Sequence, residues 1–221
     1  PGHIAGVTGP PGAGKSSLLS ELIREWRGGG RSVAVLAVDP SSKRSGGSLL
    51  GDRARIAFDP ADERVFIRST AAAGRLGGLA PATREAAAAL AAAFDVVVVE
   101  TVGVGQSETD VAEVADTVAV VVQPASGDTL QFLKSGIMEI PDVLVVTKSD
   151  LGEVAMRARR DLSAALRSVG DRETPVVAVS SLPPAQGIAG LVAALDAHRE
   201  RLDLRRRRLA ARRATALADF A

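Results

Sequence analysis

Residues 9–16 read G-P-P-G-A-G-K-S, and this short segment constrains the fold more than any other part of the chain. The residues before it, 3–8, are mostly apolar and include β-branched side chains, which predicts a strand. Apolar residues after it recur at helical spacing over 17–27, which predicts an amphipathic helix. A strand that passes through a glycine-rich turn into a helix gathers backbone N–H groups and the helix dipole around a phosphate. This context favours a phosphate-binding loop over a chance turn.

Two side chains of this loop have predicted roles. Lys15 adds a positive charge at the β- and γ-phosphates, which also makes it a catalytic candidate, and the Ser16 hydroxyl can ligate Mg²⁺. The pattern therefore predicts that the chain binds a nucleoside triphosphate. The residues expected to contact it in this loop are Gly9, Gly12, Ala13, Gly14, Lys15, Ser16 and Ser17.

Short β-rich runs alternate with helical segments along the rest of the chain, which is typical of a doubly wound α/β domain. The four valines at 96–99 form a continuous apolar run, as in strands that are buried on both faces of a parallel sheet. The expected strands are 3–8, 32–38, 64–67, 95–101, 117–122, 143–146 and 175–179. The expected helices are 17–27, 79–93, 129–138, 153–168 and 187–199, with a further helix over 200–221.

The composition argues against several kinds of protein. The 221 residues include no cysteine and two histidines, so neither a disulfide framework nor a Cys/His metal site is expected. The net charge is +1, from 27 basic and 26 acidic residues, which gives no general signature of nucleic-acid or membrane binding. No signal peptide and no uninterrupted run of 18 apolar residues stands out, so a cytoplasmic protein is expected.

Ligands of an open parallel sheet bind beyond the carboxyl ends of its strands, so acidic residues at those ends are metal candidates. In one expected strand Asp95 and Glu100 are about 16 Å apart, at about 3.3 Å per residue, so only Glu100 lies near the phosphates. Its carboxylate can hold Mg²⁺ or a water bound to it, and the Gly103 N–H can sense a γ-phosphate. Asp39 follows a strand and Asp52 closes a glycine-rich loop; both are metal candidates, although a cap or turn role also explains them.

The residue that would position the attacking water differs from the Ras-like pattern. Ras-like GTPases place a glutamine directly after the glycine of D-x-x-G. Val104 occupies that position here and cannot form hydrogen bonds through its side chain, and Gln106 follows two residues later. We therefore predict slow unassisted hydrolysis that a partner or a second copy of the chain accelerates. Arg44, Arg53 and Arg84 are candidates to stabilise the transition-state charge, and the sequence does not choose among them.

The segment Thr147-Lys148-Ser149-Asp150 follows an expected strand and matches the pattern [NT]-K-x-D. An aspartate here can accept hydrogen bonds from guanine N1–H and from its exocyclic amine, whereas adenine offers no such pair of donors. The stem of Lys148 can lie along the base, and Thr147 stands where asparagine is commoner. A second base-contacting loop is expected after the last strand, at Ser180, Ser181 and Leu182, although an ordinary serine-rich turn explains these residues equally well.

Five segments together resemble the MeaB/ArgK GTPases, the chaperones of methylmalonyl-CoA mutase and related B12-dependent acyl-CoA mutases. They are residues 9–18, 38–53, 66–80, 100–108 and 127–150, and they include the strings V-D-P-S-S, G-G-S-L-L-G-D and E-T-V-G-V-G-Q-S-E. The resemblance implies a three-layer α/β fold of the P-loop NTPase class, SIMIBI type, with a mainly parallel central sheet. It also implies GTP, GDP and Mg²⁺ as ligands and a B12-dependent acyl-CoA mutase as partner, with no nucleic-acid or membrane partner.

The resemblance implies roles for individual residues as well. The implied Mg²⁺ ligands are Ser16, Asp39, Asp52 and Glu100, and the candidate catalytic residues are Lys15, Glu100, Gly103 and Gln106. Asp128 and Lys134 match positions thought to relay the nucleotide state to the mutase. From the sequence alone, an N-cap explains Asp128 and a solvated helix residue explains Lys134 equally well.

The resemblance divides the chain into two parts. Residues 1–198 are expected to form the GTPase domain, and 199–221 an arginine-rich helix at the possible start of a dimerisation arm, so full-length family proteins are expected to be homodimers. A solvated helix face also explains the arginine run at 205–208. The rival functions are a metal- or cofactor-insertion GTPase of the same class, a P-loop kinase linked to amino-acid transport, and a GTP-dependent switch without useful turnover.

Overall fold

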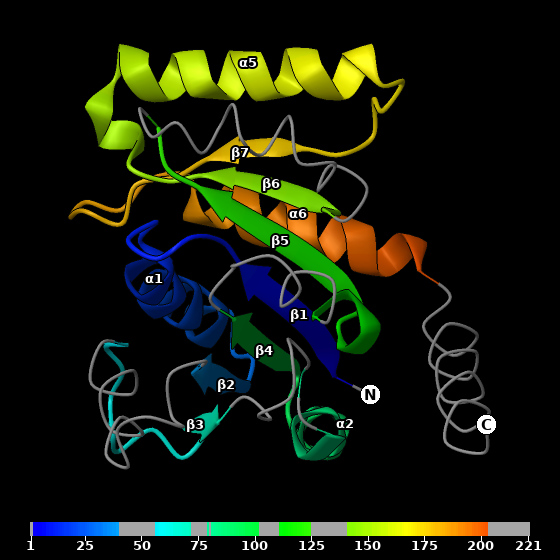
Figure 1. The fold of residues 1–221 in the computed structure, drawn as a ribbon. Helices are drawn as coiled ribbons and strands as arrows, with labels where there is room; N and C mark the ends of the chain where they lie inside the picture. Colours follow the sequence, from blue (N-terminus) through cyan, green and yellow to red (C-terminus); the bar gives the residue numbers. More distant parts are fainter. Residues whose placement is uncertain are drawn as a thin grey trace, which may run out of the picture.

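The structure is a computed structural model, and it describes residues 2–39, 56–71, 79, 81–101, 111–124 and 141–202. In this part of the chain, a seven-stranded parallel sheet forms the middle layer (Figure 1). The strand order is β3-β2-β4-β1-β5-β6-β7. The strands are β1 (His3–Thr8), β2 (Val33–Asp39), β3 (Val65–Ala71), β4 (Val96–Thr101), β5 (Thr117–Val122), β6 (Val143–Val146) and β7 (Val176–Ala178). All seven strands expected from the sequence are present, and every neighbouring pair is parallel.

The edge strand β3 is longer than the sequence predicts. The apolar pattern stops at residue 67, but β3 continues to Ala71 and pairs with β2 over the whole length of both strands. The polar residues Arg68, Ser69 and Thr70 interrupt the pattern without interrupting the backbone pairing. Side-chain periodicity reports which face is buried, and it therefore misses backbone pairing where polar residues end a strand.

Helices cover both faces of the sheet and give the expected three-layer α/β architecture (Figure 1). One face packs against α1 (Lys15–Gly28) and α6 (Ile188–Arg201), and the other against α2 (Pro81–Ala93) and α5 (Glu153–Ser168). Successive side chains of a strand point to opposite faces. Accordingly Val97 and Val99 of β4 belong to the cluster under α2 and α5, whereas Val96 and Val98 belong to the cluster under α1 and α6.

The four described helices agree with the sequence predictions to within two residues at each end. The predicted helices 17–27, 79–93, 153–168 and 187–199 correspond to α1, α2, α5 and α6. The predicted helix 129–138, and the part of 200–221 beyond residue 202, lie outside the described residues. Two helical turns were not predicted, at 111–114 and in the short 3₁₀ element η4 (Ser149–Leu151). No helix in the described part of the chain is long and apolar enough to cross a membrane.

Because all strands run the same way, the sheet has two chemically different edges. We call the edge at which the strands end the carboxyl edge; its residues include Thr8, Thr101, Val122 and Val146. We call the edge at which they begin the amino edge; its residues include His3, Val96, Thr117 and Val143. The glycine-rich loop follows β1 and therefore lies at the carboxyl edge.

Candidate functional site

The loop after β1 turns at three glycines with positive φ. Gly9, Gly12 and Gly14 have φ values of 151°, 78° and 86°. A Cβ on Gly9 would lie 2.2 Å from the carbonyl oxygen of Val121 in β5, so the close approach of two strands requires glycine here as well. Gly14 is the N-cap of α1 and makes no side-chain cap. No side chain therefore caps the start of α1, and the N–H groups at the start of a helix attract anions.

Lys15, the first residue of α1, folds back over this loop. Its side chain is buried, and Nζ donates hydrogen bonds to the carbonyl oxygens of Gly9 at 2.8 Å and Pro10 at 3.0 Å. These bonds offset part of the cost of burying an ammonium group. The loop thus carries a positive charge inside its own turn, where the oxygens of a polyphosphate would meet it.

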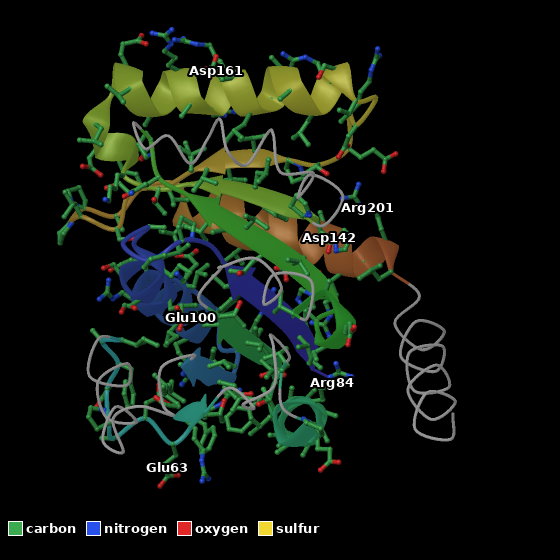
Figure 2. All side chains as sticks on the ribbon, viewed as in Figure 1. Glu63, Arg84, Glu100, Asp142, Asp161 and Arg201 are labelled. Carbon is green, nitrogen blue, oxygen red and sulfur yellow. The ribbon has the colours of Figure 1, made fainter. Side chains whose placement is uncertain are left out.

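Glu100 lies beside the loop on β4 (Figure 2). Its Cα is paired with that of Val7, two residues before Gly9, and only 7% of the residue is exposed. Ser16 follows Lys15 in the first turn of α1. Carboxylate and hydroxyl oxygens are the donors that Mg²⁺ prefers, so this pair of residues fits the ion.

The other two predicted Mg²⁺ ligands are not placed by the structure. Asp39 ends β2 with its Cα paired to Ala71, but its side chain lies outside the described residues, as does all of Asp52. Among the residues that are described, no group of three His, Cys, Asp or Glu side chains is placed to hold a metal. The four-ligand site remains a prediction, with Ser16 and Glu100 as its described members.

The predicted base-contacting segment follows β6 at the same edge. Lys148 has a φ of 54°, an uncommon left-handed conformation for a residue other than glycine, and its Nζ donates a hydrogen bond to Gln123 Oε1 at 2.7 Å. Asp150 is the middle residue of η4, and its Oδ1 accepts a hydrogen bond from Ser180 Oγ at 2.7 Å. The segment therefore presents a lysine stem and an oriented carboxylate side by side.

Thr147 ties this segment to the glycine-rich loop. The residue is buried, and its Oγ1 lies 2.7 Å from the carbonyl oxygen of Ala13 and 3.2 Å from that of Val122. A hydroxyl has one hydrogen to donate, and the shorter contact assigns it to Ala13. The threonine thus joins two loops that are 134 positions apart in the sequence. The sequence showed only that Thr147 stands where asparagine is commoner.

The structure also brings the loop after β7 to the base-contacting segment. Ser180 is buried, forms an isolated bridge with Gln186, and orients Asp150 through its hydroxyl. The Leu182 N–H donates to Ser180 Oγ at 3.2 Å, and the leucine side chain is exposed. Ser180 therefore has a defined role beside Asp150, whereas for Ser181 and Leu182 base contact remains a prediction.

A family model described as Methylmalonyl Co-A mutase-associated GTPase MeaB matches residues 2–220. The chain belongs to the MeaB family. A Pyrococcus abyssi protein named as a GTPase is 46% identical over 209 residues, which are 91% of this chain and 64% of that protein. The mouse protein named methylmalonic aciduria type A homolog, mitochondrial, is 45% identical over 156 residues, which are 70% of this chain and 37% of the mouse protein. The chain therefore spans only part of the length of these MeaB-family relatives.

Solved structures share the fold. The crystal structure of LAO/AO transport system kinase matches with a TM-score of 0.70 at 30% identity and covers 99% of this chain and 66% of that chain. HypB from Helicobacter pylori, solved in complex with nickel, matches with a TM-score of 0.64 at 19% identity, over 90% of this chain and 88% of that chain. At 19% identity, the similarity to HypB establishes the shared fold and nothing further. Together these matches confirm the SIMIBI-type P-loop architecture that the sequence predicts.

Several residues to which the MeaB resemblance gives roles fall outside the described part of the chain, so the structure does not test them. They are Asp52, Gly103, Gln106, Asp128 and Lys134, together with the candidate arginines Arg44 and Arg53. Arg84 is described. It forms an ion pair with Glu113 and lies apart from Glu100 (Figure 2), which argues against a role for Arg84 in stabilising the transition-state charge.

Two further residues of this MeaB-family site were not found by sequence reasoning. Gln123 follows β5 and holds the Lys148 ammonium, and Thr8 ends β1 directly before Gly9 with a buried hydroxyl that has no hydrogen-bond partner. A glutamine after a strand carries no recognisable signal. The position of Thr8 between an apolar strand and a glycine-rich turn is a signal that could have identified it.

Proposed function

We propose that this chain is the nucleotide-binding part of a MeaB-family GTPase, which binds GTP and GDP with Mg²⁺ and hydrolyses GTP to GDP and phosphate. The observation that carries the proposal is the 2.7 Å contact between Thr147 Oγ1 and the carbonyl oxygen of Ala13. It joins the base-contacting segment to the glycine-rich loop. A ligand that spans both loops carries a base at one end and a phosphate chain at the other.

The hydrogen bond between Asp150 and Ser180 supports guanine as the base. Because Ser180 Oγ donates to Asp150 Oδ1, the carboxylate is oriented before a ligand arrives. An oriented carboxylate can accept from N1–H and the exocyclic amine of guanine together. Adenine carries neither donor in that arrangement, so it would cover this exposed carboxylate without pairing with it, which favours guanine.

The phosphate end of the ligand meets Lys15 and the first N–H groups of α1. Ser16 and Glu100, with Asp39 and Asp52, would hold Mg²⁺ there. The ion, when bound, neutralises the negative charge that develops on the phosphates during hydrolysis. In the proposed site Lys15 binds the phosphate oxygens, and Gly103 and Gln106 lie on the segment that follows Glu100 in the sequence.

Partner-dependent hydrolysis follows from the absence of a Ras-like glutamine. Val104 cannot orient water through its side chain, so we propose slow turnover that rises on contact with a partner. The family description names methylmalonyl-CoA mutase, and the mouse relative carries the name of a methylmalonic aciduria protein. We therefore propose a chaperone that supports a B12-dependent acyl-CoA mutase, with Asp128 and Lys134 as switch residues. In the full-length protein, residues 199–221 would begin a dimerisation arm.

Base specificity can be tested by titrating the chain with fluorescent derivatives of GTP, ATP and xanthosine triphosphate in Mg²⁺. We expect the wild type to bind GTP most tightly. Asp150→Asn should weaken GTP binding by about 10- to 100-fold and improve xanthosine triphosphate binding, because xanthine carries a carbonyl where guanine carries the amine. Asp161→Asn, on the exposed side of α5, is the matched control and should change neither. Equal affinity of the wild type for GTP and ATP would contradict the proposal.

The partner can be tested by pull-down and by hydrolysis. The chain is incubated with a B12-dependent acyl-CoA mutase in the presence of GDP or of a non-hydrolysable GTP analogue, and phosphate release is followed with and without the mutase. We expect nucleotide-dependent capture and faster phosphate release. Capture in neither state would contradict the chaperone role, and rapid release without a partner would contradict the gated mechanism. Transfer of label to a small molecule instead of water would indicate a kinase.

A further inference from the structure

A chain of four polar side chains crosses the amino edge of the sheet, far from the nucleotide site. His3 Nε2 lies 2.8 Å from Thr117 Oγ1, which lies 2.8 Å from His198 Nδ1. His198 Nε2 lies 3.1 Å from Asp142 Oδ1. The four residues come from the first residue of β1, the first residue of β5, the last turns of α6 and the residue before β6. Figure 2 shows Asp142 beside the end of α6.

Part of this array resembles a hydrolytic triad of hydroxyl, imidazole and carboxylate, but it cannot act as one. Thr117 is fully buried, so no substrate can reach its hydroxyl. His3 is almost fully buried as well, whereas the side chains of His198 and Asp142 are 15% and 23% exposed. Protons from solvent therefore reach the four residues at the His198 end.

The direction of the hydrogen bonds follows from counting protons. Asp142 is a carboxylate and only accepts, so a neutral His198 carries its proton on Nε2 and accepts at Nδ1. The Thr117 hydroxyl then donates to His198, and its oxygen accepts from His3, which carries its proton on Nε2. When His198 is protonated, both of its nitrogens donate. The single hydroxyl proton of Thr117 must then turn toward His3, which has to accept at Nε2 and carry its proton on Nδ1 instead.

We propose that these four side chains form a two-way hydrogen-bond relay in which one proton taken up at His198 reverses the donor direction at Thr117 and changes the tautomer of His3. Every contact of the relay is satisfied in both states, because each reversal exchanges one donor for one acceptor. The end of α6 therefore stays attached to β1, β5 and β6 while the edge gains a proton. A valine at position 117 would leave a ring nitrogen of each histidine without a partner, and an unpaired buried group is costly.

The two histidines of the relay have different surroundings. Burial lowers the pKa of His3 to about 4; Asp116 before β5 and Asp196 on α6 oppose this change, and Arg199 and His198 on α6 add to it. His3 is therefore neutral near pH 7, where it can change tautomer but not charge. His198 faces the carboxylate of Asp142 directly, and that contact becomes an ion pair when the imidazole is protonated.

The relay can be tested by long-range ¹⁵N–¹H spectroscopy of the histidine rings in the 221-residue chain. The chain has two histidines, so two ring systems appear, and His3→Gln assigns them. At pH 8 we expect both rings to carry the proton on Nε2. As the pH falls, His198 should become doubly protonated, and His3 should change to the Nδ1–H tautomer with the same midpoint. A His3 ring that keeps its tautomer through the His198 titration, or that gains its own proton with His198, would overturn the proposal.

Two variants separate the relay from a general effect of pH. Thr117→Val removes the hydroxyl, so the His3 tautomer should no longer follow His198. Thr70→Val is the matched control, because Thr70 is also a strand threonine but its hydroxyl has no partner, and it should leave the coupled change intact. If Thr117→Val does not fold, His198→Gln provides the same test, since an amide does not titrate. A His3 tautomer that still changes with the wild-type midpoint in either variant would refute the relay.

Discussion

The two edges of the sheet are built in opposite ways. At the amino edge, aspartates and histidines form hydrogen bonds across neighbouring strands. At the carboxyl edge, several of the described strand-ending hydroxyls have no hydrogen-bond partner. Since both edges belong to the same sheet, between the same two hydrophobic clusters, the difference reflects what each edge does. The amino edge holds the strands together, and the carboxyl edge is where the proposed nucleotide would bind.

The amino edge repeats one device three times. Asp95, Asp116 and Asp142 each stand directly before a strand, and each accepts a hydrogen bond from a backbone N–H next to a neighbouring strand or within it. The three donors are Ser32 N at 2.7 Å, Ile4 N at 2.9 Å and Val118 N at 2.8 Å, respectively. These bonds give backbone N–H groups at the start of the sheet an acceptor within the protein. At Asp95 the backbone and hydroxyl hydrogen bonds from Ser32 lower the pKa of the carboxyl below its usual value.

The carboxyl edge shows the reverse pattern. Among the described residues, the buried side-chain oxygens without a hydrogen-bond partner are the hydroxyls of Thr8, Ser69, Thr70 and Thr101. All four lie in the last three residues of β1, β3 or β4. Buried polar groups without partners cost stability, so their gathering at one edge indicates a function other than stability. Water or a bound ligand would satisfy them.

The largest expected effect concerns His3, the most buried titratable residue of the amino edge. Burial holds the pKa of His3 at about 4 in the folded chain, against 6.5 for an ordinary histidine. The unfolded chain therefore binds more protons between these values, so stability should fall as the pH drops from 6.5 to 4, by about 3 kcal/mol. Urea unfolding at a series of pH values measures this loss. His3→Gln, which keeps a donor but does not titrate, should flatten the profile over this range, and an unchanged profile would show that another group causes the loss.

The second prediction concerns the replacement of Asp116, one of the three aspartates of the amino edge. Asp116→Ala should lower the free energy of unfolding by about 1–3 kcal/mol, because the buried N–H of Ile4 loses its acceptor. Asp116→Asn keeps an acceptor oxygen and is the matched control, and it should cost clearly less. Chemical denaturation at pH 7.5 distinguishes the two variants. Equal losses would mean that the charge of Asp116 matters and the hydrogen bond does not, which would weaken the contrast between the edges.

Much of the fold could be predicted from the sequence because the buried strands are long apolar runs. The predicted bounds of β1, β5 and β6 agree with the structure at every residue. The contacts of the amino edge could not be predicted, because they join residues far apart in the chain. His3 and Thr117 are 114 positions apart, and Thr117 and His198 are 81 apart. A sequence shows that a histidine is present, but only the packed sheet shows which hydroxyl it meets.

The candidate site also combines features that the sequence predicts with contacts that it does not. The glycine-rich loop was predictable because its residue types and spacing are themselves the requirement for close backbone approach. The role of Ser180 was not, since the sequence allowed an ordinary turn equally well, and the hydrogen bond to Asp150 depends on how β7 is placed beside β6. The contact between Thr147 and Ala13 is also set by tertiary structure, because the two residues meet only when β6 and the loop after β1 reach the same edge.

The third prediction tests whether the carboxyl edge depends on its few paired groups. Thr147→Val removes the bond to Ala13 and should lower the free energy of unfolding by about 1 kcal/mol, with a similar loss in nucleotide binding of about fivefold. Thr147→Asn is expected to recover most of both, because its amide can donate to the same carbonyl oxygen. Binding titrations with GTP and denaturation curves measure the two quantities. Recovery of stability without recovery of binding would mean that the threonine itself contacts the ligand.

The smallest expected effect comes from comparing a threonine of the carboxyl edge, Thr8, with a threonine of the amino edge, Thr117. Thr8→Val replaces a buried hydroxyl that has no partner with a methyl group of similar size, so the free energy of unfolding should be unchanged or rise by up to about 1 kcal/mol. Thr117→Val at the amino edge is the matched substitution, and there the lost hydroxyl has two partners, so stability should fall. Denaturation curves of both variants without nucleotide measure the two changes in the free energy of unfolding. A comparable loss in Thr8→Val would show that this hydroxyl is satisfied in solution, and the carboxyl edge would then be as fully paired as the amino edge.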